Sequence, residues 1–169
     1  INFMTHDEII IAVGGNIYNS EGVHPMQICD NAINLLNDYH IRVVKQSKWY
    51  VSEPIPISSQ PKYYNKVIIA KSMLNEVQIL NTLHNIEAKF GRVRNITNEP
   101  RVLDLDLIDC FGIIRNNNNI TLPHPRAHLR RFVIEPLAEI HPHWTHPIYK
   151  NTAIHILENL DNQNVKILT

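Results

Sequence analysis

The sequence has few cysteines and no excess of charge of either sign. Its two cysteines, Cys29 and Cys110, are far apart and lack C-x-x-C spacing. This argues against a disulfide scaffold or a cysteine-based zinc site and favours a reducing, cytoplasmic location. Lys and Arg together number 16, as do Asp and Glu, so no overall positive field would recruit nucleic acid or an anionic membrane. We expect neither as a partner.

The sequence also lacks the signatures of several large protein classes. No apolar run approaches the roughly 20 residues that span a bilayer, and we expect no signal peptide from the pattern of these residues. Gly14-Gly15-Asn16 follows an apolar segment but does not continue into G-x-G-x-x-G or a P-loop, so a dinucleotide-binding fold is not expected. No nucleophile elbow supports Ser-His-Asp catalysis. The sequence has ten histidines, and the most closely grouped ones, at 124, 128, 141, 143 and 146, lie among prolines that interrupt helices, which disfavours a helical zinc site.

The length and composition predict one globular domain. The chain has 169 residues, of which 44% are hydrophobic and 19% charged, and a chain of this size buries a substantial core. We therefore expect a single domain over residues 1–169. The numbering opens with Ile1 and the first methionine is Met4, as in a domain excised from a longer, multifunctional chain.

The hydrophobic periodicity predicts elements in the order β-α-β-β-α-β. That order is typical of the α+β, ferredoxin-like split βαβ fold, an antiparallel sheet with helices packed on one face. Beyond it we expect a hairpin tip at 116–119, a short helix within 127–140 interrupted at Pro136, and a terminal helix marked by Ile154 and Leu157. The six main elements are expected at 8–13, 25–39, 41–52, 63–72, 75–90 and 99–109.

The last of these strands has the most distinctive pattern. Residues 99–109 read EPRVLDLDLID, and side chains alternate between the two faces of a strand. Asp104 and Asp106 therefore share one face, about 7 Å apart, opposite a row of leucines. Two carboxylates this close repel unless a cation or a shared proton lies between them. The pattern fits a divalent metal site, although paired aspartates are often only a solvated edge.

Arginines lie just before this strand. Arg92, Arg94 and Arg101 add positive groups beside the aspartates. Arg101 is at odd parity with them and would face the leucine side unless the strand begins after it, which Pro100 favours. Carboxylates for magnesium together with arginines for phosphate oxygens are what phosphoryl or pyrophosphoryl transfer requires.

Other classes of function remain open at this point. A two-metal phosphodiesterase or nuclease would need a further carboxylate, and the nearest, Asp109, has the opposite parity. A non-catalytic ferredoxin-like module that binds a ligand or RNA would need exposed aromatics and a basic face. Tyr63 and Phe132 could sandwich a flat heterocycle. His124, between two prolines, could donate a hydrogen bond to a phosphate.

The run at 100–108 closely resembles the signature of the 6-hydroxymethyl-7,8-dihydropterin pyrophosphokinase family of folate biosynthesis. Further motifs occur in that family's order and spacing, so the resemblance covers essentially the whole chain. They are Gly14-Gly15-Asn16, Tyr63-Tyr64-Asn65, Glu87 with Gly91-Arg92-Val93-Arg94, and Pro123-His124-Pro125-Arg126 with Arg130 and Phe132.

The resemblance implies a magnesium- and ATP-dependent enzyme that transfers the β,γ-pyrophosphoryl group of ATP to the hydroxymethyl oxygen of the pterin and releases AMP. Asp104 and Asp106 would hold two Mg²⁺ ions and, with Arg92 and Arg101, form the catalytic set. The implied partners are ATP and the pterin, with possible fusion to, or association with, neighbouring folate enzymes.

The resemblance also implies two binding sets, over which the loops at 14–24, 53–62 and 92–100 would close and exclude water. The pterin set is Ser52, Ile55, Tyr63, Asn65 and Phe132. The ATP set is Glu87, Arg94, Leu107, Thr121, His124 and Arg130.

Overall fold

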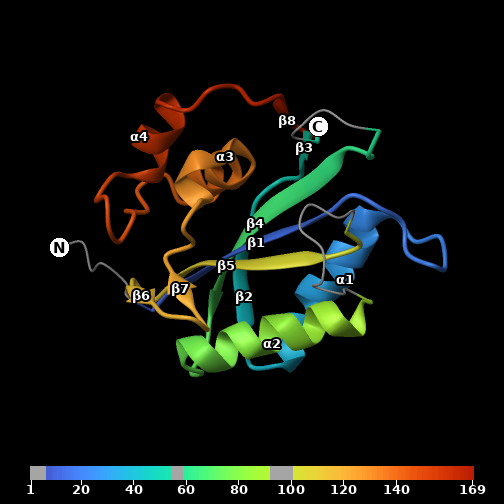
Figure 1. Ribbon diagram of the computed structural model, residues 1–169, viewed down its shortest axis with the longest axis horizontal. Helices are drawn as coiled ribbons and strands as arrows, with labels where there is room; N and C mark the ends of the chain where they lie inside the picture. The colour runs from blue at the N-terminus through green and yellow to red at the C-terminus, as the bar shows by residue number, and fades with distance from the viewer. Residues whose placement is uncertain (1–6, 55–58, 92–100) are drawn as a thin grey trace.

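One antiparallel sheet runs through the centre of the computed structural model, which describes residues 7–54, 59–91 and 101–169. Its strand order is β5-β1-β4-β3-β8, and β2 also pairs with β4 (Figure 1). The central part of this order is the split βαβ arrangement that the sequence predicts. The strands are β1 (Ile9–Gly15), β2 (Arg42–Gln46), β3 (Tyr50–Ser52), β4 (Tyr63–Lys71), β5 (Asp104–Cys110) and β8 (Val165–Ile167).

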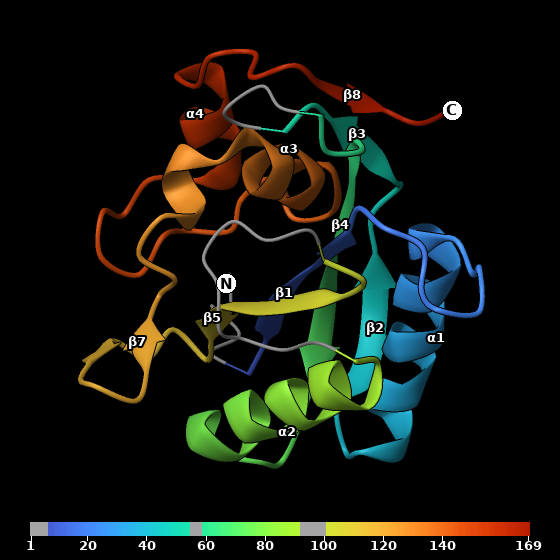
Figure 2. The ribbon, with the colours of Figure 1, turned by 45° about the vertical axis from the view of Figure 1, so that its right-hand side comes forward.

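Helices cover both faces of the sheet, so the expectation of helices on one face was wrong (Figure 2). The physical reason lies in the central strands, whose continuous apolar runs need cover on both sides. A small hairpin of β6 (Arg115–Asn116) and β7 (Thr121–Leu122) and a 3₁₀ turn at Ala127–Leu129 lead into the second helical layer. One layer contains α1 (Pro25–Asp38) and α2 (Glu76–Lys89), and the other contains α3 (Arg131–Ile140) and α4 (Ala153–Glu158).

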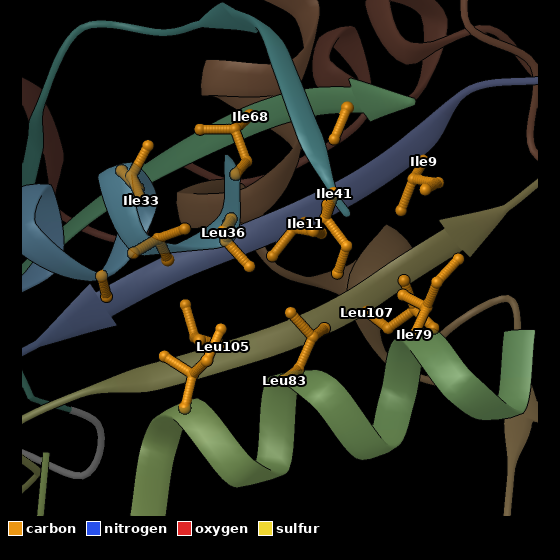
Figure 3. Close-up of a cluster of buried hydrophobic side chains, with 14 of the residues drawn as sticks. Ile9, Ile11, Ile33, Leu36, Ile41, Ile68, Ile79, Leu83, Leu105 and Leu107 are labelled. Carbon is orange, nitrogen blue, oxygen red and sulfur yellow. The ribbon is translucent and has the colours of Figure 1, made fainter. Parts of the chain in front are cut away.

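The core is divided by the sheet into two clusters. Ile9, Ile11 and Val13 of β1 are buried with residues of α1 and α2, and Figure 3 shows side chains of this cluster between the sheet and α2. Ile10, on the same strand, instead joins the cluster that contains Leu137 of α3. Successive side chains of β1 therefore pack alternately against the two helical layers.

Local sequence signals set the beginnings of the first two helices. The side chain of His24 accepts a hydrogen bond from the amide of Met26, and Pro25 occupies the first turn of α1. Asn75 and Gln78 form a reciprocal capping box at the start of α2. The helices expected at 25–39 and 75–90 are therefore confirmed to within a residue at each end. None of the helices in the described ranges is long and apolar enough to cross a membrane.

Two predicted elements were wrong in detail. The strand expected at 41–52 is broken into β2 and β3, because the Ser47 hydroxyl takes the amide hydrogen bond of Val67 on β4 (3.0 Å). The helix expected to be interrupted at Pro136 runs through it. Pro136 removes one i→i−4 hydrogen bond and crowds the preceding turn, but Val133 and Leu137 stay buried on either side of it and keep the helix packed.

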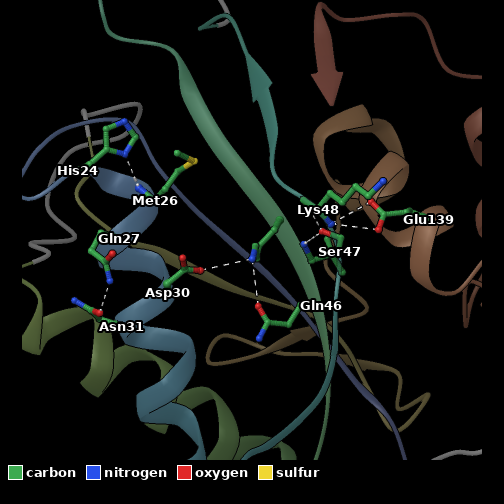
Figure 4. Close-up of polar contacts among 11 residues, drawn as sticks. His24, Met26, Gln27, Asp30, Asn31, Gln46, Ser47, Lys48 and Glu139 are labelled. Carbon is green, nitrogen blue, oxygen red and sulfur yellow. Dashed lines mark hydrogen bonds and ion pairs between the residues drawn. The ribbon is translucent and has the colours of Figure 1, made fainter. Parts of the chain in front are cut away.

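Polar contacts fix α3 and α1 against the sheet (Figure 4). The Glu139 carboxylate accepts the Lys48 amide at 3.1 and 3.2 Å and the Tyr50 hydroxyl at 2.8 Å. Across the sheet, the Lys66 ammonium lies 3.5 Å from the Asp30 carboxylate of α1. The contacts of Glu139 hold the last turn of α3 against β3 and the segment that precedes it.

Candidate functional site

A cavity of about 720 Å³ opens where β1 ends and β5 begins, under the start of α3. Backbone and side chains from β1, β3, β4, β5 and the segment before α3 meet there. The lining residues are Ala12, Val13, Gly14, Gly15, Ser52, Glu53, Tyr63, Asn65, Arg101, Asp104, Asp106, His124, Arg126, Leu129, Arg130, Phe132 and Gln163.

The two aspartates of β5 both line this cavity. Leu105 and Leu107 are buried in the core on the other side of the strand, which is the alternation that the sequence predicts. Burial, the Asp104 carboxylate and the Glu87 carboxylate raise the pKa of Asp106 to about 7. Such a pair is fully ionised near neutral pH only when positive charge is close to it, so these carboxylates fit a hard divalent cation such as Mg²⁺.

Arg101 directs its charge to this pair. It precedes β5 and is not part of the strand, so the parity that would have turned it toward the leucines does not apply. Its Nη1 atom donates to Asp104 Oδ2 at 2.8 Å. Arg126 and Arg130 also line the cavity, and burial together with Arg126 lowers the pKa of Arg130. Three guanidinium groups that face one cavity are suited to a multiply charged anion.

His124 is positioned as a neutral hydrogen-bond donor. Its amide donates to the Ile108 carbonyl (2.8 Å), and its Nδ1 accepts the Arg126 amide (3.1 Å). Burial and the neighbouring Arg130 and Arg126 lower the pKa of His124 to about 4. Because Nδ1 acts as the acceptor, the neutral ring carries its proton on Nε2, from which it can donate to an anion.

Aromatic and amide side chains line the same cavity. They include Tyr63, Asn65 and Phe132, with Ser52 beside them, as the resemblance implied for the pterin set. The backbone of Gly14 approaches Asn65 closely, since a Cβ atom on Gly14 would lie 2.3 Å from Asn65 Oδ1. Two rings and an amide are suited to a flat, polar heterocycle.

A second cavity of about 190 Å³ shares Asp106 and His124 with the first. Leu107 and Thr121, both predicted in the ATP set, line it. The two cavities therefore meet at the carboxylate and imidazole groups. The other lining residues are Leu80, His84, Leu105, Asn119, Ile120 and Leu122.

Not every predicted residue lies at these cavities. Glu87 is 1% exposed and lines neither of the two, and its Oε2 accepts the Leu105 amide at 3.0 Å. Ile55, Arg92 and Arg94 lie outside the described residues. The predicted set missed Glu53, Arg126, Leu129 and Gln163. Of these, Arg126 had a signal because it belongs to the Pro-His-Pro-Arg motif, and Glu53 because it begins the loop at 53–62 that was expected to close over the substrates.

Comparisons with known proteins give consistent results. Residues 10–142 match the family model described as 7,8-dihydro-6-hydroxymethylpterin-pyrophosphokinase (HPPK). The 2-amino-4-hydroxy-6-hydroxymethyldihydropteridine pyrophosphokinase of Haemophilus influenzae is 36% identical over 130 residues, which are 77% of this chain and 79% of that protein. The folic acid synthesis protein fol1 of Pneumocystis carinii is 30% identical over 165 residues, which are 98% of this chain. The chain spans only 22% of that second relative's length.

A solved structure shares the fold. The wild-type HPPK-DHPS protein of Plasmodium falciparum matches with a TM-score of 0.69 at 12% identity, over 90% of this chain and 40% of that one. At this identity the match bears on the fold alone. The family model, however, covers well over half of the chain. The chain therefore belongs to the 7,8-dihydro-6-hydroxymethylpterin-pyrophosphokinase family.

Proposed function

We propose that the chain transfers the pyrophosphoryl group of ATP to the hydroxymethyl group of 6-hydroxymethyl-7,8-dihydropterin, giving the pterin diphosphate and AMP. One observation carries this proposal. The Asp104 and Asp106 carboxylates, three guanidinium groups, two aromatic rings and the Asn65 amide line a single cavity. We assign the carboxylates and guanidinium groups as its charged end and the rings with the amide as its aromatic end. A charged donor and a flat acceptor would therefore meet inside one enclosure.

The aromatic end would bind the pterin. Tyr63 and Phe132 would stack on its faces, and Asn65, with the backbone near Ser52, would hydrogen-bond its polar edge. This places the hydroxymethyl group toward the carboxylates. Stacking and edge hydrogen bonds orient the acceptor before reaction, which lowers the entropic part of the barrier.

The charged end would bind the triphosphate. Arg101, Arg130 and neutral His124 would contact phosphate oxygens, and Leu107 and Thr121 would line the nucleotide side. In the proposed reaction the hydroxymethyl oxygen bonds to the β-phosphorus as the bond from that phosphorus to the α–β bridging oxygen breaks. AMP leaves and a proton is released. Arginines fixed near the moving charge lower the barrier electrostatically.

We assign Asp104 and Asp106 as the ligands of two Mg²⁺ ions. Bound magnesium would neutralise phosphate charge and polarise the phosphoryl group under attack. Within the described ranges no group of three or more His, Cys, Asp or Glu side chains converges on a metal position. The remaining ligands are therefore assigned to phosphate oxygens and water, as is usual for Mg²⁺ at nucleotide sites.

The phosphodiesterase alternative receives no support from Asp109. Its carboxylate is buried away from the cavity and accepts the Trp144 indole N–H at 2.8 Å and the Gly112 amide at 3.1 Å. Asp109 is thus a structural carboxylate, and it adds no ligand to Asp104 and Asp106.

The test is an AMP assay with ATP, magnesium and the reduced pterin. Asp104→Ala and Asp106→Ala should each lower turnover by roughly a hundredfold or more while the fold is kept, because charge stabilisation at the phosphates is lost. Asp38→Ala, at an exposed position at the end of α1, is the matched control. Wild-type rates of pterin diphosphate formation in either cavity variant would refute the metal assignment.

We also propose that this domain acts in the cytoplasm as part of, or together with, a larger folate-synthesis assembly. The small share that the chain covers of the Pneumocystis folic acid synthesis protein supports this. Size-exclusion chromatography of the protein from its native source would test it, because a free domain would elute at about the 19.6 kDa of this chain.

A further inference from the structure

Asn16 lies directly after β1 and connects three segments that are distant in the sequence. Its side chain is 2% exposed. Its Nδ2 donates to Gln60 Oε1 at 3.2 Å and to the Pro61 carbonyl at 3.3 Å. Its Oδ1 accepts the Arg101 amide at 2.7 Å. The end of β1, the segment before β4 and the entrance to β5 therefore meet at one side chain.

The contacts continue on both sides of Asn16 to residues that line the cavity. Gln60 Oε1 also accepts the Tyr63 hydroxyl at 3.1 Å, and Tyr63 belongs to the aromatic end. On the other side, the Arg101 guanidinium donates to Asp104 at the charged end (2.8 Å). Asn16 and Gln60 are not among the lining residues. They form a hydrogen-bonded bridge behind the cavity wall.

The backbone beside Asn16 is held equally tightly. The Asn16 amide donates to the Arg101 carbonyl at 2.8 Å, so these two residues are joined through both backbone and side chain. At Gly15, an added Cβ would lie 2.4 Å from the Val102 carbonyl oxygen. Arg101 is therefore fixed relative to β1 by contacts that involve none of its own side-chain atoms.

We propose that Asn16 is a positioning residue that fixes the aromatic end of the cavity relative to Arg101 and the aspartates, an inference that rests on the proposed function. A buried amide side chain can hydrogen-bond to both neighbouring segments at once, because its oxygen accepts while its nitrogen donates. Displacement of a reacting group by about 1 Å can cost roughly a hundredfold in rate. A rigid link between acceptor and donor sites therefore contributes directly to turnover.

The two halves of the bridge can be separated by substitution. In Asn16→Asp the carboxylate still accepts the Arg101 amide but no longer donates to Gln60 and Pro61. In Gln60→Leu the acceptor shared by Asn16 and Tyr63 is lost, while the contact between Asn16 and Arg101 remains. Both variants should raise the KM and the directly measured Kd for the pterin by about tenfold. The Kd for a non-hydrolysable ATP analogue with Mg²⁺ should change by less than about twofold.

The decisive measurement is a double-mutant cycle on pterin Kd, measured by titration calorimetry. The double variant should weaken pterin binding no more than the stronger single variant, because both remove one bridge. Asn34→Asp, on the exposed face of α1, is the matched control and should leave the pterin Kd unchanged. Thermal unfolding, measured for every variant, distinguishes displacement of the binding residues from loss of the fold.

The outcomes distinguish this inference from the proposed function. If the wild-type protein forms no AMP, the proposed function fails. If the wild type turns over but the two substitutions combine multiplicatively, or neither changes pterin binding, the role of Asn16 is refuted and the function stands.

Discussion

His146 is a buried histidine that should make the stability of this protein depend on pH. Its side chain is 2% exposed, and its Nδ1 accepts the amides of Ile148 and Tyr149, each at 3.1 Å. Burial and the neighbouring His128 lower the pKa of His146 from 6.5 to about 4. The folded protein thus keeps this ring neutral over a range in which an unfolded chain would protonate it.

The size and sign of the effect follow from that difference. Only the unfolded state takes up the proton as the pH falls from about 6.5 toward 4, so stability is full above about 6.5 and is lost in acid. Each pKa unit corresponds to about 1.4 kcal/mol, so the loss from His146 is about 2 kcal/mol at pH 5 and about 3 kcal/mol below pH 4. That is a large part of the stability of a small domain.

Urea unfolding at about pH 7.5 and pH 5 measures this loss through the linear dependence of the unfolding free energy on denaturant. In His146→Asn the side-chain oxygen can still accept the two amides but does not titrate. The variant should therefore lose about 2 kcal/mol less than the wild type between the two pH values, even if its smaller side chain lowers stability at both. His143→Asn, at an exposed position, is the control. Equal losses in the wild type and His146→Asn would refute the reasoning.

Three further predictions follow from individual contacts. Trp144→Phe removes the indole donor to Asp109 and should lower the unfolding free energy in urea by about 1–3 kcal/mol; an unchanged midpoint would contradict it. Gly15→Ala places a Cβ 2.4 Å from the carbonyl oxygen of Val102, which should displace the segment that enters β5 and lower the AMP-forming rate by about a hundredfold. A Gly15→Ala variant that forms AMP at the wild-type rate would contradict this prediction. Glu139→Ala removes the acceptor that joins α3 to β3 and to Lys48 just before it. The substitution should cost about 2 kcal/mol in the same urea assay, whereas an effect within about 0.5 kcal/mol would mark the contact as energetically neutral.

Features that depend on neighbouring residues could be predicted from the sequence. The alternation in β5 placed both aspartates in the cavity and the leucines in the core, because side-chain direction in a strand has a period of two. The cap at Asn75 and the proline at the start of α1 follow from similarly local rules. These signals needed no knowledge of tertiary contacts.

Features that depend on distant contacts could not be predicted in this way. The bridge at Asn16 joins residues 44 positions apart, and the contact between Lys48 and Glu139 spans 91. The break between β2 and β3 depends on the Ser47 hydroxyl and a strand 20 residues away. No periodicity reveals such pairs, since hydrophobic pattern reports only which face of an element is buried.

The buried position of Glu87 could have been predicted from the sequence, although the family resemblance placed this residue in the ATP set. Glu87 follows Ile79, Leu83 and Ile86 at a spacing that places all four on one buried face of α2. A carboxylate in such a stripe must find a hydrogen-bond donor there. The donor is the Leu105 amide on β5, and β5 is the last strand in the sheet order, so its outer amides have no neighbouring strand to accept them.

The contact between Glu87 and the Leu105 amide stabilises the fold and also affects the electrostatics of the candidate site. Because Leu105 lies between the two aspartates, Glu87 satisfies the strand edge at the point where negative charge is already concentrated. Its carboxylate is one of the causes that raise the pKa of Asp106. Arg101 opposes this effect but donates to Asp104 rather than to Asp106. A cation bound between the aspartates would therefore relieve repulsion that the fold itself builds in. The buried carboxylate of Glu87 would strengthen the attraction of the proposed site for Mg²⁺ without acting as a ligand.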